Sequence, residues 1–136
     1  MVRIMAAIVA TVFGALAALL HVYIFVLESV QWTLPRVWRR FGVADQGAAD
    51  MIRPMAYNQG FYNLFLALGA AVGLGLFWIG GLGTVADVAG RTLALFSLGA
   101  MIAASLVLLT TGMRYLMAAL LQGTAPLVAF VFLLLA

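Results

Sequence analysis

Long apolar runs separated by short polar links dominate the chain. Four runs stand out, at residues 4–30, 57–79, 92–111 and 115–135. A helix needs about 20 residues to cross the hydrocarbon core of a bilayer, because each residue adds about 1.5 Å along the axis. None of the runs alternates apolar and polar residues, which argues against the strands of a membrane barrel. The pattern predicts an all-α, polytopic membrane protein whose four transmembrane helices form one bundle.

The first run begins like a signal peptide. Arg3 precedes it, and Ala15 and Ala17 are small enough for a cleavage site. The apolar stretch continues through residues 22–26, however, which is longer than a typical signal core. We therefore expect a retained transmembrane helix.

Composition supports a lipid environment. Of the 136 residues, 67% are hydrophobic and only 8% are charged, too few charges to cover a soluble domain of this size. The chain is expected to form a single transmembrane domain, residues 1–136, with the lipid bilayer as its main partner. The absence of cysteine excludes disulfides, thiol catalysis and thiolate metal sites.

The links between the runs indicate the orientation. The one sizeable link, residues 33–56, lies by connectivity on the same face as the turn around Gly112 and Arg114. That face carries five arginines, whereas the other carries Arg3 and Arg91. Positive residues gather on the cytoplasmic side, so both termini are expected on the non-cytoplasmic side of a bacterial cytoplasmic (inner) membrane. The net charge of +3 has this explanation, and no nucleic-acid partner is expected.

Aromatic and proline positions agree with these boundaries. Trp32, Trp38 and Tyr115 on one face, with Trp78 on the other, fit aromatic belts at the two membrane interfaces. Pro54 suits an early position in the second helix.

Small residues recur at four-residue spacing inside the runs, as at Gly69 and Gly73, and at Gly99 and Ala103. Such spacing lets helix backbones approach closely in lipid. Packing within one bundle is the simpler interpretation, and a homo-oligomer stays open.

Polar side chains inside the runs are the candidates for function, because they are costly in a membrane. His21 and Glu28 lie seven residues apart, on nearly the same face of the first helix. The second helix opens with two polar pairs at i, i+4 spacing, Asn58 with Tyr62 and Gln59 with Asn63. These six residues are our candidates for ligand-binding or proton-linked groups.

A comparison of depths predicts a pocket. About 10 Å inward from the arginine-rich boundary, each helix contributes one polar residue: His21, Asn63, Ser105 and Gln122. We expect a polar pocket that opens toward the cytoplasm. The secondary candidates around it are Tyr23, Gln31, Trp32, Arg114 and Gln122.

Several of these residues also have a purely structural interpretation. Asn, Gln and Ser often hydrogen-bond between helices, with a contribution of about 1 kcal/mol each, and this suits Ser105 and Gln122. Glu28 could instead anchor the helix at the interface by pairing with Arg36 or Arg114. No metal or cofactor is expected, since His21 and Glu28 lie about 10 Å apart along the axis and no second histidine or nucleotide-binding loop is present.

Three local strings carry a family resemblance. They are H-x-Y-I-x-x-L-E at residues 21–28, Trp32 shortly after it, and N-Q-G-x-Y-N-x-F-L-A at residues 58–67. With Pro35, Arg36, Phe41 and Gly42 in the first link, the chain resembles the small bacterial membrane proteins grouped as domain of unknown function 1304. The resemblance covers nearly the whole chain and implies a four-span fold and a residue set, but no activity.

A second comparison covers less of the chain. Four-helix enzymes of membrane-associated eicosanoid and glutathione metabolism open their second helix with R-x-x-N-x-x-E. Here the spacing from Arg53 to Asn58 differs, and Phe61 stands where that glutamate is expected. These departures argue against glutathione chemistry.

The leading hypothesis is a protein that binds or transports a small molecule through the polar pocket. A competing hypothesis is a membrane-embedded enzyme acting on an amphipathic or lipid-like substrate, with His21 or Glu28 as general acid or base and Tyr62 or Arg114 stabilising an anion. A third is an accessory subunit of a membrane complex. Whether the chain is an enzyme stays open, although no nucleophile–base pair supports catalysis.

Overall fold

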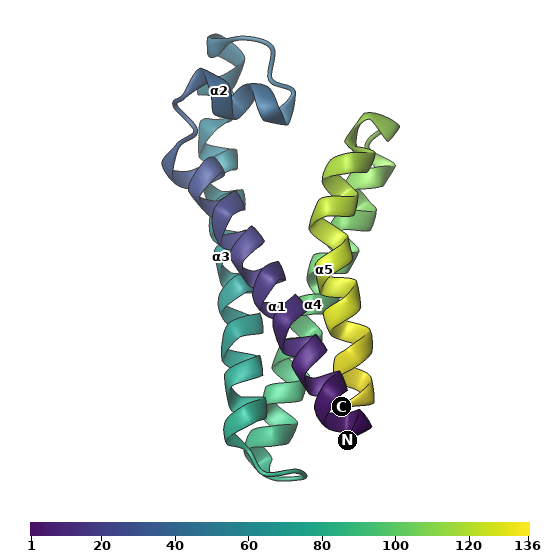
Figure 1. The fold of residues 1–136 in the computed structure, drawn as a ribbon. Coiled ribbons are helices and arrows are strands. Elements are labelled where there is room, and N and C mark those ends of the chain that lie inside the picture. The colour runs from purple at the N-terminus through teal and green to yellow at the C-terminus, as the bar shows by residue number, and fades with distance from the viewer. The chain divides into compact units, whose positions relative to one another are not determined.

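A computed structural model describes all residues, 1–136, and contains helices and no strands (Figure 1). Four helical segments are long and apolar enough to cross a membrane: Val2–Val30, Gln46–Ile79, Val85–Thr110 and Met113–Leu135. Only 22–28% of the most apolar part of each segment is buried inside the protein, so lipid must cover the rest. The prediction of an all-α, multi-pass membrane protein is confirmed.

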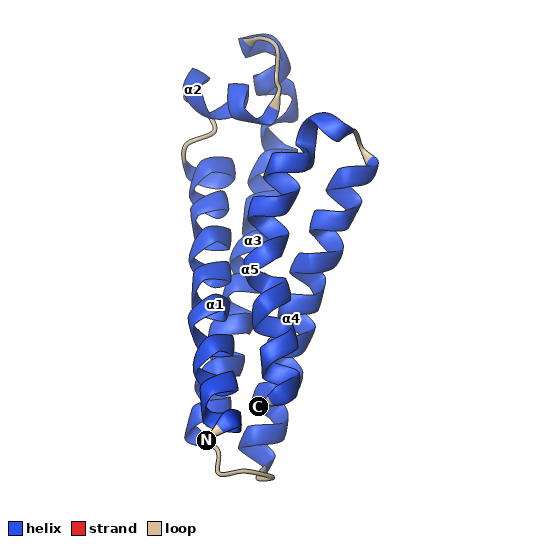
Figure 2. Cartoon of the chain, turned by 45° about the vertical axis from the view of Figure 1, so that its right-hand side comes forward, coloured by secondary structure: helices blue, strands red, loops and turns tan.

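The helices follow one another with short connections (Figure 2). Helix α1 (Val2–Phe25) continues directly into a π-helical turn, η1 (Val26–Val30). The short helix α2 (Pro35–Trp38) and the 3-10 turn η2 (Arg39–Phe41) precede α3 (Gln46–Ile79). The chain then forms α4 (Val85–Thr110), the 3-10 turn η3 (Met113–Tyr115) and α5 (Leu116–Leu135).

Helix α3 starts at Gln46, whereas the apolar pattern predicts a start near Tyr57. The helix begins in a polar segment that precedes the apolar run. There Asp45 Oδ1 accepts a hydrogen bond of 2.9 Å from the backbone N–H of Ala48 and so caps the first turn. Pro54 consequently lies inside the helix rather than in its first turn. Much of the link expected at residues 33–56 is therefore helical.

The chain packs as two compact units. Unit 1 comprises Met1–Leu20 and Leu66–Ala136, and unit 2 comprises His21–Phe65. Each has its own group of buried apolar residues.

Unit 1 is built on close helix contacts. A Cβ added at Gly73 of α3 would lie 2.5 Å from the backbone nitrogen of Ala94 in α4. One added at Gly69 would meet the hydroxyl of Ser97, and one at Gly90 would meet the backbone of Phe77. The predicted close approach is thus confirmed at Gly69 and Gly73. The core around these contacts is rich in alanine and includes Ala7, Ala10, Ala17, Ala67, Ala70, Ala94 and Ala129, with Leu98, Met101 and Leu133.

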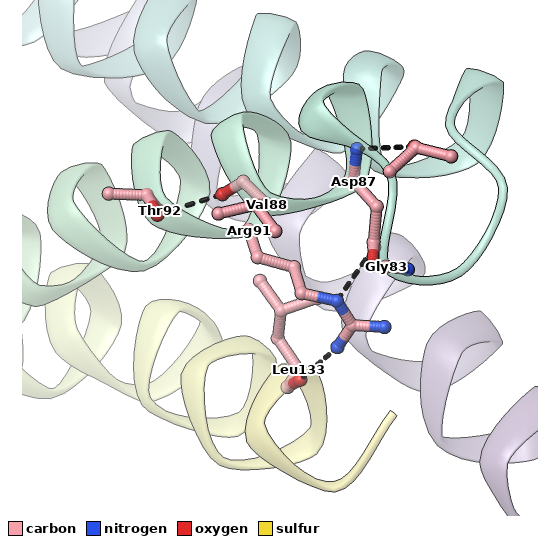
Figure 3. Close-up of polar contacts among 7 residues, drawn as sticks. Gly83, Asp87, Val88, Arg91, Thr92 and Leu133 are labelled. Carbon is pink, nitrogen blue, oxygen red and sulfur yellow. Dashed lines mark hydrogen bonds and ion pairs between the residues drawn. The ribbon is translucent and has the colours of Figure 1, made fainter.

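The start of α4 in unit 1 is held by a charged pair (Figure 3). Arg91 Nε donates to Asp87 Oδ1 at 2.7 Å, and Arg91 Nη1 donates to the carbonyl of Leu133 in α5 at 3.3 Å. The other oxygen of Asp87 accepts from the backbone of Gly83 at 2.9 Å, and the hydroxyl of Thr84 caps the helix. This arrangement ties the α3–α4 link to α5.

The α4–α5 connection confirms the predicted tight turn. Gly112 has φ +148°, a conformation that side chains rarely adopt, and η3 follows it directly. Farther along the hairpin, a Cβ on Gly123 would meet the hydroxyl of Ser105. The two helices of this hairpin are therefore in close contact at Ser105 and Gly123.

Unit 2 has a core around two tryptophans. Trp32 and Trp38 are 5% and 3% exposed, so they do not form the exposed interfacial belt that the sequence suggests. The indole of Trp32 donates to the carbonyl of Ala49 at 3.0 Å, which joins the segment after η1 to the start of α3. The other members of the core are Leu27, Val37, Ala49 and Ala56. Trp78 of unit 1, by contrast, is half exposed.

Candidate functional site

The most unusual backbone in unit 2 surrounds Glu28. The turn η1 is π-helical, and the backbone N–H of Gln31 reaches the carbonyl of Val26 at 2.9 Å, five residues back. Such turns are rare and occur frequently at functional sites. Within this one, Glu28 is only 8% exposed, so its carboxyl group is enclosed by protein.

Glu28 is paired with a neutral amide from α3. Asn63 Nδ2 donates to Glu28 Oε2 at 2.9 Å and also contacts the carbonyl of Gln59 at 3.2 Å. Asn63 is itself 7% exposed. The structure therefore brings together one residue from each of the two polar strings that the sequence singles out.

No cation neutralises Glu28 within unit 2. It forms no ion pair with any arginine of the unit, so of the two partners proposed for an anchor, Arg36 and Arg114, Arg36 is not paired with it. A carboxylate offers about four acceptor positions, and the hydrogen bond from Asn63 occupies one. The site can therefore accept further hydrogen bonds or a positive charge.

Gly60 lets α3 come close to η1, and sequence reasoning missed its role. A Cβ at this position would lie 3.1 Å from both the Cβ of Glu28 and the backbone nitrogen of Ser29. It would also meet the hydroxyl of Ser29, which donates to the carbonyl of Tyr57 at 2.8 Å. The available signal was a glycine within a helix, between the two polar pairs.

His21 is fully buried, at 0% exposure. It belongs to unit 2 and lies seven residues before Glu28 on the same helical segment. Between them, the ring of Phe25 packs edge-on against that of Phe61 in α3, with centroids 5.1 Å apart. His21 is thus part of the protein interior and does not face lipid.

Asn58, Gln59 and Tyr62 are placed differently from the expectation. All three side chains are exposed, and Tyr62 is 54% exposed. Helical periodicity explains this, because Gly60 and Asn63 lie on the face toward η1 whereas the other three positions fall outside it. Of the four polar candidates at the start of the second predicted helix, only Asn63 contacts Glu28.

Two secondary candidates, Tyr23 and Gln31, line a separate cavity of about 340 Å³ in unit 2. The hydroxyl of Tyr23 accepts a hydrogen bond of 2.8 Å from Arg40. The remaining lining residues are Leu27, Arg36, Val37 and Arg40. A third candidate, Trp32, is held by its bond to Ala49 and does not line this cavity.

The other polar candidates lie in unit 1. The guanidinium of Arg114 is 4.7 Å from the ring of its neighbour Tyr115, and Gln122 is half-buried. The hydroxyl of Ser105 bonds within its own helix, to the carbonyl of Ile102 at 2.7 Å. That these residues share a pocket with His21 and Asn63 stays a prediction.

The chain contains no group of three or more His, Asp or Glu side chains arranged to hold a metal ion. The chemistry available around Glu28 is that of a carboxyl group, a primary amide and a hydroxyl. These groups bind by hydrogen bonding and can exchange a proton.

Comparisons with known proteins agree with this fold and give no activity. Neither the curated proteins nor the solved structures yield a match. The sequence model of one family matches residues 15–134, a range that includes both polar strings and the whole of unit 2. The chain therefore belongs to this family, which is described as protein of unknown function (DUF1304).

Proposed function

We propose that the protein binds a small molecule at Glu28 inside the membrane and that Glu28 exchanges a proton as the molecule binds or leaves. One observation carries the proposal: Glu28 is 8% exposed in a transmembrane segment, and within unit 2 only the amide of Asn63 contacts its carboxyl group. Ionisable residues in such segments are costly and mark ligand or proton pathways.

The chemistry of the site favours a ligand that donates hydrogen bonds or carries a basic group. The carboxyl group of Glu28 accepts, and the π-helical turn allows the helix to be locally irregular where a ligand would contact it. The buried imidazole of His21 is a second polar group of the same membrane segment. Transport would follow if ligand and proton exchanged on both sides of the membrane, and a chain this short would do so as a homo-oligomer.

The proposal includes a location, with the link that contains α2 on the cytoplasmic side of a bacterial inner membrane. Support comes from the four arginines at positions 36, 39, 40 and 53. Because the chain has no cysteine, Ala44→Cys in this exposed link would be the only thiol. A membrane-impermeant maleimide should label it in inverted vesicles and not in intact spheroplasts. The opposite labelling would reverse the orientation.

Native mass spectrometry in mild detergent tests ligand binding directly. Wild type should retain a small molecule that Glu28→Gln and His21→Ala lose, whereas Asp50→Asn should retain it. Asp50 is a suitable control because it is an exposed carboxylate of the same unit, hydrogen-bonded only to Gln46. If all four proteins carry no molecule, or if the two variants only lose stability, the polar groups serve helix packing and the proposal is wrong.

A further inference from the structure

The cavity of about 340 Å³ in unit 2 is distinct from the Glu28–Asn63 pair, since neither of those residues lines it. Its walls come from two elements. Tyr23 in α1, Leu27 in η1 and Gln31 just after η1 follow one another at four-residue intervals. Arg36, Val37 and Arg40 come from α2 and η2.

Neither of the two arginines is paired with a carboxylate. Arg36 is exposed and forms no ion pair, and Arg40 has no acidic partner either. Arg40 Nη1 donates a hydrogen bond of 2.8 Å to the hydroxyl of Tyr23, which holds its guanidinium toward the side of α1. Two guanidinium groups at one cavity, without a carboxylate among the lining residues, make an anion site.

The rest of the lining indicates what kind of anion. Leu27 and Val37 are buried apolar residues, and Gln31 adds a neutral amide. Tyr23 and Leu27 belong to the transmembrane segment, so the cavity extends from the arginines along the side of a membrane helix. A ligand that carries an anionic group at one end and an apolar body at the other matches this order of residues.

We propose that Arg36 and Arg40 bind a phosphate group, and that its source is the headgroup of an anionic phospholipid. Guanidinium groups recognise phosphate oxygens through paired hydrogen bonds. Tyr23 acts as a positioning residue that orients Arg40. The proposal is independent of ligand binding at Glu28.

Native mass spectrometry of the protein in nanodiscs containing equal phosphatidylglycerol and phosphatidylcholine tests this site. Wild type should retain phosphatidylglycerol in preference to phosphatidylcholine. Arg36→Gln should lower that preference roughly tenfold, the effect of losing one charge-assisted contact. The side chain of Arg36 forms no ion pair within the chain and is exposed, so this variant should fold like wild type.

Arg39→Gln is the matched control. It removes the same charge from the same segment, but Arg39 lies over the ring of Trp38, at 5.2 Å, and does not line the cavity. It should keep the wild-type preference, and Arg40→Lys should fall between it and Arg36→Gln. Equal losses in Arg39→Gln and Arg36→Gln, or no preference in wild type, would overturn the proposal.

A titration with inorganic phosphate distinguishes the two possible sources of the phosphate group, a phospholipid headgroup and free phosphate. If millimolar phosphate raises the unfolding temperature of wild type but not of Arg36→Gln, while phosphatidylglycerol is not retained, the site binds free phosphate and the lipid assignment is wrong. If phosphate has no effect and the lipid preference is present, the lipid assignment holds.

Discussion

The two units each bury a carboxyl group, but the groups that surround the two carboxyls differ. In unit 1, Asp87 is 4% exposed and is surrounded by the guanidinium of Arg91 and the backbone N–H of Gly83. In unit 2, Glu28 is 8% exposed and receives one hydrogen bond, from the neutral amide of Asn63. A buried carboxylate that has an ionic partner and hydrogen-bond donors stabilises the fold. A buried carboxyl group with one neutral donor favours binding of a proton or of a ligand.

The backbone is regular around Asp87 and irregular around Glu28. Asp87 lies in the first turn of a regular, capped α-helix, next to the glycine contacts that bring α3 and α4 together. Glu28 lies on a π-helical turn. Unit 1 therefore has the features of a rigid support, and unit 2 those of a site. Substitutions in unit 1 should change stability, and substitutions around Glu28 should change binding more than stability.

The largest effect on stability is expected from Gly73→Val. The new side chain would force apart the backbones of α3 and α4, because even its Cβ would lie 2.5 Å from Ala94 N. We expect a loss of about 3 kcal/mol in unfolding free energy. Gly75→Val is the control on the same helix, where an added Cβ meets nothing within 4 Å. Reversible unfolding in mixed micelles measures both, and equal losses would contradict the assigned packing.

A direct comparison of the carboxyl groups comes next. Asp87→Asn should lower the unfolding temperature by several degrees, because it leaves Arg91 without its ionic partner. Glu28→Gln should change the unfolding free energy by less than about 1 kcal/mol, since the new amide oxygen can still accept from Asn63. Thermal unfolding in detergent compares the two. Similar losses of stability would remove the distinction between the units.

Gly60→Ala should produce a smaller loss of stability and a clear loss of ligand. Its methyl group would push against Ser29 and Glu28, at an expected cost of about 1–2 kcal/mol. Gly47→Ala is the control in the first turn of the same helix, where the nearest atom, Asp45 Oδ1, is 3.4 Å away. Native mass spectra and unfolding curves should be recorded together. Full ligand retention in Gly60→Ala would show that the contact with η1 does not shape the site.

The smallest effect is expected for Trp32→Phe. This change keeps most of the buried ring but removes the hydrogen bond to Ala49, which contributes about 1 kcal/mol. Unfolding should become easier by that amount, with the phospholipid preference and the ligand at Glu28 unchanged. Loss of either ligand would mean that this contact positions a binding site as well as the core.

The sequence predicts the four spans well because length and hydropathy alone determine which segments enter lipid. It predicts the start of α3 poorly, because the helix extends beyond the apolar run and its start depends on a cap at Asp45. The burial of Trp32 and Trp38 was also missed, since an interfacial belt and a small core have the same composition.

For the candidate site, the useful signal was the energetic cost of placing a polar side chain in the membrane. It selected Glu28 and Asn63, which do meet, and it selected His21, which is buried. It also selected Asn58, Gln59 and Tyr62, which are exposed, because Gly60 and Asn63 lie on the face of α3 toward η1 and the other three positions fall outside it. The π-helical turn has no sequence signature that periodicity could detect.

Labelling with dicyclohexylcarbodiimide tests the contrast between the two carboxyl groups most directly. This apolar reagent reacts with protonated carboxyl groups in apolar surroundings, and peptide mass spectrometry locates the adduct. In nanodiscs near neutral pH, we expect an adduct on Glu28, its absence in Glu28→Gln, and no adduct on Asp87. An adduct on Asp87, or an unreactive Glu28 in protein that is otherwise native, would contradict the account.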